Sequence, residues 1–236
     1  MGMSSGRITG VIGAMEQELA LLKDAANIRE KAVRAGMEFY VGTLGGAEVV
    51  IVRCGIGKVN AGLCVQILAD GFHVTHVVNT GVAGSLDDRL RIGDIVISTD
   101  AAQHDFDVSP LGFQKGEIPY TGLYAFPADA ALRRRALEAA KGAADSAVSV
   151  YEGRVCSGDQ FISDAAVKAR IVREFDGLCC EMEGAAVAQA CYLNGLPFVI
   201  VRAISDSADG ESPASFEKFT ARAAANCAAI VRGMLT

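Results

Sequence analysis

Apolar runs and amphipathic segments alternate along most of this chain, as they do in proteins that flank a sheet with helices. Residues 8–13 form a short apolar run and are predicted as a strand, and residues 16–25 as the helix that follows it. Residues 37–44 and 49–53 alternate or run apolar on either side of Gly45-Gly46. That pattern predicts a β-hairpin.

The rest of the chain continues the alternation. Residues 58–70 are predicted as a helix whose apolar stripe consists of Val59, Leu63, Ile67 and Leu68. Further strands are predicted at residues 76–80, 94–98, 148–156 and 198–201, and further helices at residues 129–144, 164–175, 185–193 and about 215–234. Residues 101–127, rich in Gly, Pro and aromatic side chains, are predicted as loop and extended chain.

Alternating strands and helices predict a three-layer α/β/α sandwich around a central mixed β-sheet. The chain shows no internal repeat, low-complexity tract or linker. We therefore expect a single domain over residues 8–236, preceded by a short N-terminal extension over residues 1–7.

Composition narrows the functions to consider. A net charge of −6 and a pI near 5.1 disfavour a nucleic-acid partner and leave a small molecule as the expected ligand. The seven cysteines form no Cys-x-x-Cys pair and do not cluster with the three histidines, which is typical of reduced thiols in a cytoplasmic protein. The apolar runs are too short to span a membrane.

Two segments place polar groups beside apolar elements. Arg202-Ala203-Ile204-Ser205-Asp206 directly follows the apolar run at residues 198–201, at the carboxyl end of a predicted strand, where open α/β sheets bind ligands. Glu181-Met182-Glu183-Gly184 opens a helix of small residues, and carboxylates there need partners if they are buried. An ion pair between Asp206 and Arg202 that only closes the strand is the structural alternative.

Other motifs exclude common nucleotide sites. Gly55-Ile56-Gly57 lacks the third glycine of a dinucleotide-binding fingerprint, because that position is Asn60. The segment at residues 81–84 is predicted as a tight turn of small residues that a flat ligand can approach, and it lacks the Lys-Ser/Thr of a P-loop. In His104-Asp105-Phe106-Asp107 the histidine and the acids would point to opposite faces of a strand, which disfavours a shared metal.

Six motifs in order and spacing give the chain its resemblance to a known family. They are Gly13-Ala14-Met15-Glu16-Gln17-Glu18, Gly55-Ile56-Gly57-Lys58-Val59, Asn79-Thr80-Gly81-Val82-Ala83-Gly84, Ser157-Gly158-Asp159-Gln160-Phe161-Ile162, Glu181-Met182-Glu183-Gly184 and Arg202-Ala203-Ile204-Ser205-Asp206. Over residues 8–234 the chain resembles the bacterial 5′-methylthioadenosine/S-adenosylhomocysteine nucleosidases of the nucleoside phosphorylase superfamily. The resemblance implies a nucleoside phosphorylase-like fold and hydrolysis of the N-glycosidic bond to adenine, with neither metal nor cofactor.

The resemblance also implies roles for the acids. Asp206 matches the acid that protonates purine N7, with Ser205 positioning it. Such an acid must hold a proton at neutral pH, which burial at a strand end favours. Glu18 matches the carboxylate that activates the attacking water, and Glu16 would be a bystander at the helix start, where acids complement the dipole. Glu183 matches the residue that binds the ribose 2′- and 3′-hydroxyls and stabilises positive charge on the sugar.

The remaining implied contacts complete a nucleoside pocket. Phe161 would stack on the purine, the Ile162 backbone would read the adenine edge, and Met182 would pack on the ribose. Met15, Ile56 and Val82 would line the cavity, and Phe216 would lie near the 5′ substituent. Leu111, Phe113 and Pro119 match a segment that enters a neighbouring subunit's site, which implies a homodimer.

One departure and two rival functions remain. Many family members have Ser at the position of Val82, and the Val form, together with Gln160-Phe161, is similar to a subgroup that also cleaves 6-amino-6-deoxyfutalosine.

A nucleoside phosphorylase would need cationic or amide donors for phosphate, whereas Glu18 would repel that anion. A non-catalytic nucleoside-binding protein is disfavoured because Glu18, Glu183 and Asp206 occur together.

Overall fold

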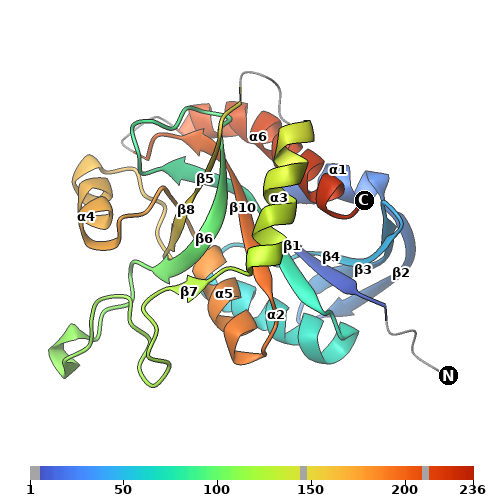
Figure 1. Cartoon of the computed structure of the whole chain (residues 1–236), viewed down its shortest axis with the longest axis horizontal. Helices are drawn as coiled ribbons and strands as arrows, with labels where there is room; N and C mark the ends of the chain where they lie inside the picture. Colours follow the sequence, from blue (N-terminus) through green and yellow to red (C-terminus); the bar gives the residue numbers. More distant parts are fainter. Residues whose placement is uncertain (1–5, 144–147, 209–212) are drawn as a thin grey trace.

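The fold is seen in a computed structural model that describes residues 6–143, 148–208 and 213–236 (Figure 1). Its strands are β1 (Ile8–Gly13), β2 (Asn27–Arg34), β3 (Met37–Leu44), β4 (Ala47–Arg53), β5 (His76–Ser85), β6 (Ile95–Gln103), β7 (Phe126–Pro127), β8 (Val150–Ser157), β9 (Cys179–Glu181) and β10 (Phe198–Asp206). Its helices are α1 (Glu16–Ala25), α2 (Lys58–Phe72), α3 (Ala130–Ala143), α4 (Ala165–Phe175), α5 (Gly184–Leu193), α6 (Pro213–Met234) and the 3₁₀ turn η1 (Ser109–Leu111).

The strands form one mixed sheet with a closed part and an open part. Along the path β10-β6-β8-β9-β5-β1-β4-β3-β2 each strand pairs with the next, and β10 also pairs with β5. The extra pairing closes β5, β10, β6, β8 and β9 into a ring. Strand β5 is the junction, since it pairs with β1, β9 and β10.

Helices cover both faces of this sheet, which gives the expected three layers (Figure 1). Helices α1, α3 and α6 pack on one face, and α2 and α5 pack on the other. Consecutive residues of β5 divide between the layers, because Val77 belongs to the core under α2 and α5 while Val78 belongs to the core under α1, α3 and α6. All ten residues of β5 are buried, as expected for a strand covered on both faces.

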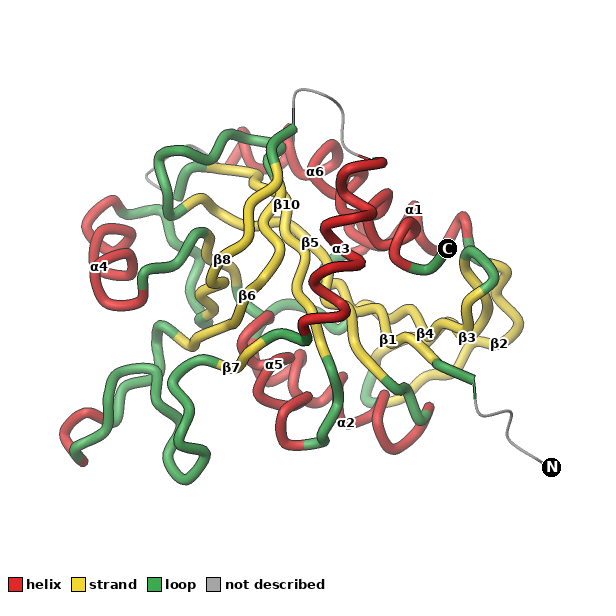
Figure 2. Tube along the Cα trace, viewed as in Figure 1, coloured by secondary structure: helices red, strands yellow, loops and turns green. Residues whose placement is uncertain are grey.

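Most predicted elements are confirmed, and several boundaries agree to the residue. Strand β1, helix α1 and the turn between β3 and β4 lie where the pattern places them. Helix α4 begins after Asp164, whose carboxylate accepts hydrogen bonds from the N–H groups of Ala166 and Val167 and so acts as the N-cap. The loop-rich stretch between β6 and β7 projects away from the sheet (Figure 2).

Other predictions were wrong. Strands β2 and β9 were not predicted, because β2 is largely polar at one edge of the sheet and β9 is three residues long. Residues 81–84 are not a turn; β5 continues through them because β10 pairs with them, and β9 pairs with Gly84. Strand β10 likewise runs on through Arg202 to Asp206.

The predicted apolar stripe of α2 was also wrong in part. Val59 and Leu63 are 73% and 49% exposed, whereas the helix buries Ala61, Cys64, Val65 and Leu68. Two large apolar side chains of α2 thus face away from the core. Within the described residues, no helix combines the length and the apolar character that a membrane span requires.

Candidate active site

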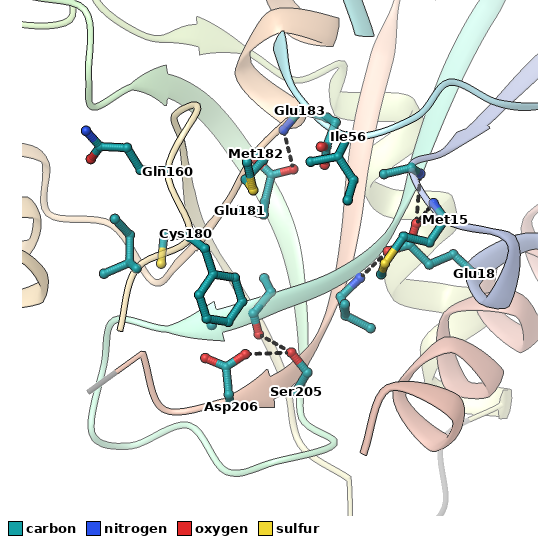
Figure 3. A pocket seen from close by; sticks show the side chains of 16 residues that line it. Met15, Glu18, Ile56, Gln160, Cys180, Glu181, Met182, Glu183, Ser205 and Asp206 are labelled. Atoms are coloured by element: carbon teal, nitrogen blue, oxygen red, sulfur yellow. Dashed lines mark hydrogen bonds between the residues drawn. The ribbon is translucent and has the colours of Figure 1, made fainter. Parts of the chain in front are cut away.

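A cavity of about 170 Å³ opens where the carboxyl ends of β5 and β10 meet the loops after β1 and β8 (Figure 3). Three acids with proposed roles in the reaction, Glu18, Glu183 and Asp206, line it together although they are far apart in the sequence. The full lining consists of Ala14, Met15, Glu18, Ile56, Val82, Ala83, Gly84, Gln160, Phe161, Ile162, Cys180, Glu181, Met182, Glu183, Ser205 and Asp206.

Glu18 is held in the first turn of α1 by backbone amides. Its carboxylate accepts hydrogen bonds from the N–H groups of Ala14 (2.7 Å), Met15 (2.9 Å) and Val82 (3.1 Å). Burial raises the pKa of Glu18, while the charge of Arg202 and the three amide donors act in the opposite direction. Glu18 is thus fixed in one orientation and binds a proton more readily than an exposed glutamate.

Glu16, two residues earlier, has the bystander position that the helix pattern predicts. Its carboxylate is 55% exposed and pairs with Lys23 Nζ at 2.8 Å. It does not line the cavity. The two glutamates therefore differ in environment although they share one helical turn.

Asp206 lies at the end of β10 and is buried against β5. Its Oδ2 accepts a hydrogen bond from Ser205 Oγ at 2.8 Å, and its Oδ1 accepts one from the Ala208 N–H at 3.0 Å. The alternative that Asp206 pairs with Arg202 is wrong, because the guanidinium bonds to Glu181 instead. The Asp206 carboxylate remains at the wall of the cavity.

Two glycines of β5 let the acids approach the sheet. A Cβ on Gly81 would lie 2.4 Å from Glu18 Oε1, and a Cβ on Gly84 would lie 2.8 Å from Asp206 Oδ1. Any side chain at either position would collide with a carboxylate. The small residues that resembled a turn thus provide space for the two acids.

Glu181 is a residue of the site that sequence reasoning left without a role. Its carboxylate pairs with Arg202 at 2.5 Å, and both side chains are nearly fully buried. It also accepts hydrogen bonds from Ser157 Oγ and from the N–H groups of Glu183 and Gly184 at the start of α5. Its distance from Arg202 along the chain explains why no local pattern revealed the pair.

Glu183 shares this acidic environment. Its Oε1 accepts a hydrogen bond from the Gly57 N–H at 2.7 Å, which ties it to the loop before α2. Burial, followed by repulsion from Glu181, raises the pKa of Glu183 to about 8, and the Gly57 amide and Arg202 only partly offset that rise. Three carboxylates thus surround a single guanidinium at this edge of the cavity.

The expected apolar contacts are also present in the lining. Met15, Ile56, Val82, Phe161, Ile162 and Met182 all line the cavity, and the Phe161 ring is 56% exposed. Gln160 and Cys180, which the sequence did not single out as contacts, line it as well. Leu111, Phe113 and Pro119 do not line the cavity of this chain, and Leu111 is 75% exposed on η1. The side chain of Phe216 lies outside the described residues.

Comparison with known proteins places this arrangement in a family. The sequence model of the family described as the phosphorylase superfamily matches residues 8–236. A 5′-methylthioadenosine/S-adenosylhomocysteine nucleosidase of Geobacillus thermodenitrificans is 44% identical, covering 96% of this chain and 95% of that protein. The nucleosidase of the same name from Treponema pallidum is 42% identical over 96% of this chain and 91% of its own length. The chain belongs to the 5′-methylthioadenosine/S-adenosylhomocysteine nucleosidases of the phosphorylase superfamily.

Solved structures of related proteins agree with this membership. The nucleosidase of Neisseria meningitidis in complex with methylthio-immucillin-A has a TM-score of 0.92 and 38% identity, covering 97% of this chain and 98% of that one. The futalosine hydrolase of Helicobacter pylori has a TM-score of 0.90 and 32% identity, covering 97% of each chain. The fold and the family thus coincide over nearly the whole chain.

The raised pKa of Glu183 predicts how stability depends on pH. The folded protein holds a proton on Glu183 up to about pH 8, whereas the unfolded chain releases it near 4.5, so the stabilisation is complete below 4.5 and is lost as pH rises through 8. We expect Glu183→Gln, which keeps an acceptor for the Gly57 amide, to remove this loss. Its melting temperature should exceed that of the wild type by roughly 3 °C or more at pH 8.5 and by much less at pH 5.

The measurement is thermal unfolding of the ligand-free protein from pH 5 to 9. Glu16→Gln is the matched control, because Glu16 is exposed and already paired with Lys23, and it should follow the wild-type pH profile. A Glu183→Gln curve parallel to that of the wild type would contradict the assignment of a strongly raised pKa to Glu183.

Proposed function

We propose that this chain hydrolyses the N-glycosidic bond of 5′-methylthioadenosine, S-adenosylhomocysteine and 5′-deoxyadenosine, releasing adenine and the 5-substituted ribose. The observation that carries the proposal is the convergence of Glu18, Glu183 and Asp206 on one cavity whose mouth carries an aromatic ring. Relatives 42–44% identical over 96% of the chain bear the name of this activity.

Asp206 is the proposed acid for the leaving base. Adenine leaves poorly as an anion, so a proton delivered to purine N7 lowers the barrier to cleavage. The Ser205 hydroxyl and the Ala208 amide each hold one carboxylate oxygen, which fixes the plane of the acid. With Phe161 at the cavity wall to stack on the purine, Asp206 is oriented toward the base.

Glu18 is the proposed base for the attacking water. Its burial raises its affinity for a proton, which suits a carboxylate that must accept one from water. Three backbone amides keep the carboxylate in place throughout the reaction. The water would attack the sugar carbon that the departing base leaves.

Glu183 is the proposed ligand of the ribose hydroxyls. The Gly57 amide occupies Oε1, so Oε2 is the oxygen available to accept a bond from a hydroxyl. As the bond to the base breaks, positive charge develops on the sugar; Glu183 stabilises it fully only in its ionised form, which that charge itself favours. Binding and rate thus both depend on Glu183.

The same charges favour water over phosphate as the nucleophile. Of the described residues that line the cavity, none is Lys or Arg, and four are acidic: Glu18, Glu181, Glu183 and Asp206. The nearby Arg202 is already paired with Glu181. A phosphate anion would meet repulsion here without a compensating cation.

The proposal predicts release of adenine from 5′-methylthioadenosine in buffer that contains no phosphate. Added phosphate should leave the rate unchanged, because water is the second substrate. Adenine release is followed by chromatography with the purified protein. Turnover that appears only with phosphate would identify a phosphorylase and remove the role given to Glu18, and absence of turnover with every nucleoside tested would favour a binding protein.

The roles of the acids predict distinct effects of three substitutions. Asp206→Asn and Glu18→Gln should each lower kcat by at least about 100-fold while nucleoside binding persists. Glu183→Gln should raise KM and lower kcat together. Steady-state kinetics gives kcat and KM, and equilibrium titration gives the affinity for the nucleoside. Asp24→Asn and Glu16→Gln, on the exposed surface, are controls that should keep wild-type values. Near wild-type turnover by Asp206→Asn would contradict its assignment.

A second substrate, 6-amino-6-deoxyfutalosine, is favoured by one position. Val82 lines the cavity where many family members carry Ser, and its amide binds Glu18. A futalosine hydrolase of 32% identity is among the similar structures. We include this nucleoside in the proposed substrate range, to be assayed beside 5′-methylthioadenosine under the same conditions.

We further propose that the chain works as a cytoplasmic homodimer. Val59 and Leu63 of α2 are exposed beside Ile56, which lines the cavity, and Leu111 is exposed on the projecting segment. A second copy that covers these side chains would bring Leu111, Phe113 and Pro119 toward a neighbouring cavity. All seven cysteines are free and buried, which suits a reducing compartment.

The dimer predicts the effect of a charge on α2. Leu63→Asp should shift the protein toward the monomer and lower kcat/KM, because a buried charge at the interface is costly and the neighbouring segment is lost. Size-exclusion chromatography with light scattering gives the mass. Val33→Asp on edge strand β2, where Val33 is 64% exposed, is the control and should remain dimeric. An unchanged mass for Leu63→Asp would place the interface elsewhere.

A further inference from the structure

Two loops that line the cavity are joined by a polar network of residues that are not themselves in its lining. Residues 55–57, before α2, supply Ile56 to the cavity, and residues 158–162, after β8, supply Gln160, Phe161 and Ile162. The Lys58 N–H donates a hydrogen bond to Asp159 Oδ1 at 2.8 Å, across about 100 residues of sequence. The first loop also binds Glu183, whereas the second carries the proposed purine contacts.

Asp105, two residues beyond the end of β6, contacts both loops. Its Oδ1 pairs with Lys58 Nζ at 2.6 Å, and its Oδ2 accepts a hydrogen bond from the Asp159 N–H at 2.8 Å. Lys58 Nζ also donates to Gln103 Oε1 at 3.0 Å. The Lys58 and Asp105 side chains are only 18% and 16% exposed, so solvent weakens this ion pair less than a surface pair.

Two successive amides connect this network to the ribose carboxylate. The Gly57 N–H donates to Glu183 Oε1, and the next amide, that of Lys58, donates to Asp159 Oδ1. Gly57 adopts a φ of +101°, and a Cβ there would lie 3.1 Å from the same Asp159 oxygen. The two amides belong to adjacent peptide planes that meet at the Gly57 Cα, so a shift of Asp159 reaches the Gly57 N–H through that one joint.

We propose that Lys58, Asp105 and Asp159 are positioning residues that couple occupancy of the base side of the cavity to occupancy of the ribose side. A purine bound against residues 158–162 orders that loop, including Asp159. Asp159 then fixes the position of the Lys58 amide, and the neighbouring Gly57 amide keeps its bond to Glu183. The assignment of the two sides rests on the proposed function. The coupling is reciprocal, so a ribose on Glu183 tightens the grip on the base by the same factor.

The coupling is measurable with the two products, adenine and 5-methylthioribose. In the wild type, adenine should bind at least about 5-fold more tightly when 5-methylthioribose saturates the protein, within the usual range of coupling between sites. Asp159→Ala removes the acceptor and should abolish this gain, while the affinity for adenine alone changes by less than about 3-fold. Calorimetric titration of each product, alone and with the other, measures these values.

Conservative variants separate coupling from simple support of the pocket. Asp159→Asn keeps Oδ1 as an acceptor for the Lys58 amide and should restore the gain, and Lys58→Arg should retain more of it than Lys58→Met. Asp88→Ala, whose side chain is fully exposed, is the surface control and should behave as the wild type. For 5′-methylthioadenosine, Asp159→Ala should lower kcat/KM by about the coupling factor that it loses.

Three results would overturn the inference. The first is a full coupling factor in Asp159→Ala, and the second is an equal loss of adenine affinity with and without 5-methylthioribose in that variant. The third is a wild type that turns over 5′-methylthioadenosine yet binds the two products independently. A wild type that neither turns over the nucleoside nor binds either product would instead refute the proposed function, and the inference with it.

Discussion

The buried ion pair between Arg202 and Glu181 is the interaction on which the site depends. Arg202 lies within β10 and Glu181 ends β9, and the guanidinium also donates to Asn79 of β5 at 2.5 Å. One cation thus joins three strands of the closed part of the sheet. Removing either partner would leave an uncompensated charge in the core, at a cost of roughly 3–5 kcal/mol.

The charge balance around this pair also sets the chemistry of the cavity. Glu18 and Glu183 lie close enough to Arg202 for its charge to lower their pKa values, yet burial outweighs it and raises both. With Glu181 already neutralising the guanidinium, neither acid gains a partner of its own. The site therefore disfavours anionic ligands and suits a neutral nucleoside and water.

Two glycines of β5 leave the space that Glu18 and Asp206 occupy. Gly81 and Gly84 are strand residues that pair with β10, and their missing side chains leave room for Glu18 at the first and for Asp206 at the second. The acids come from the first turn of α1 and from the end of β10, elements that have no sequence proximity. Each acid is then oriented by short hydrogen bonds from nearby groups of the chain.

The sequence by itself determined the elements whose cause is local. The apolar runs predict strands such as β1, and the periodic segment at residues 164–175 predicts α4, because side-chain periodicity acts over a few residues. The family resemblance likewise anticipated many residues that line the cavity, although it gave no contact role to Gln160, Cys180 or Glu181. Tertiary structure alone decided what depends on distant parts of the chain. It made the predicted turn at residues 81–84 a strand through pairing of β5 with β10, and it left Val59 and Leu63 exposed. It also made Glu181 rather than Asp206 the partner of Arg202. Pairing and burial of that kind are properties of neighbours in space, which no local pattern records.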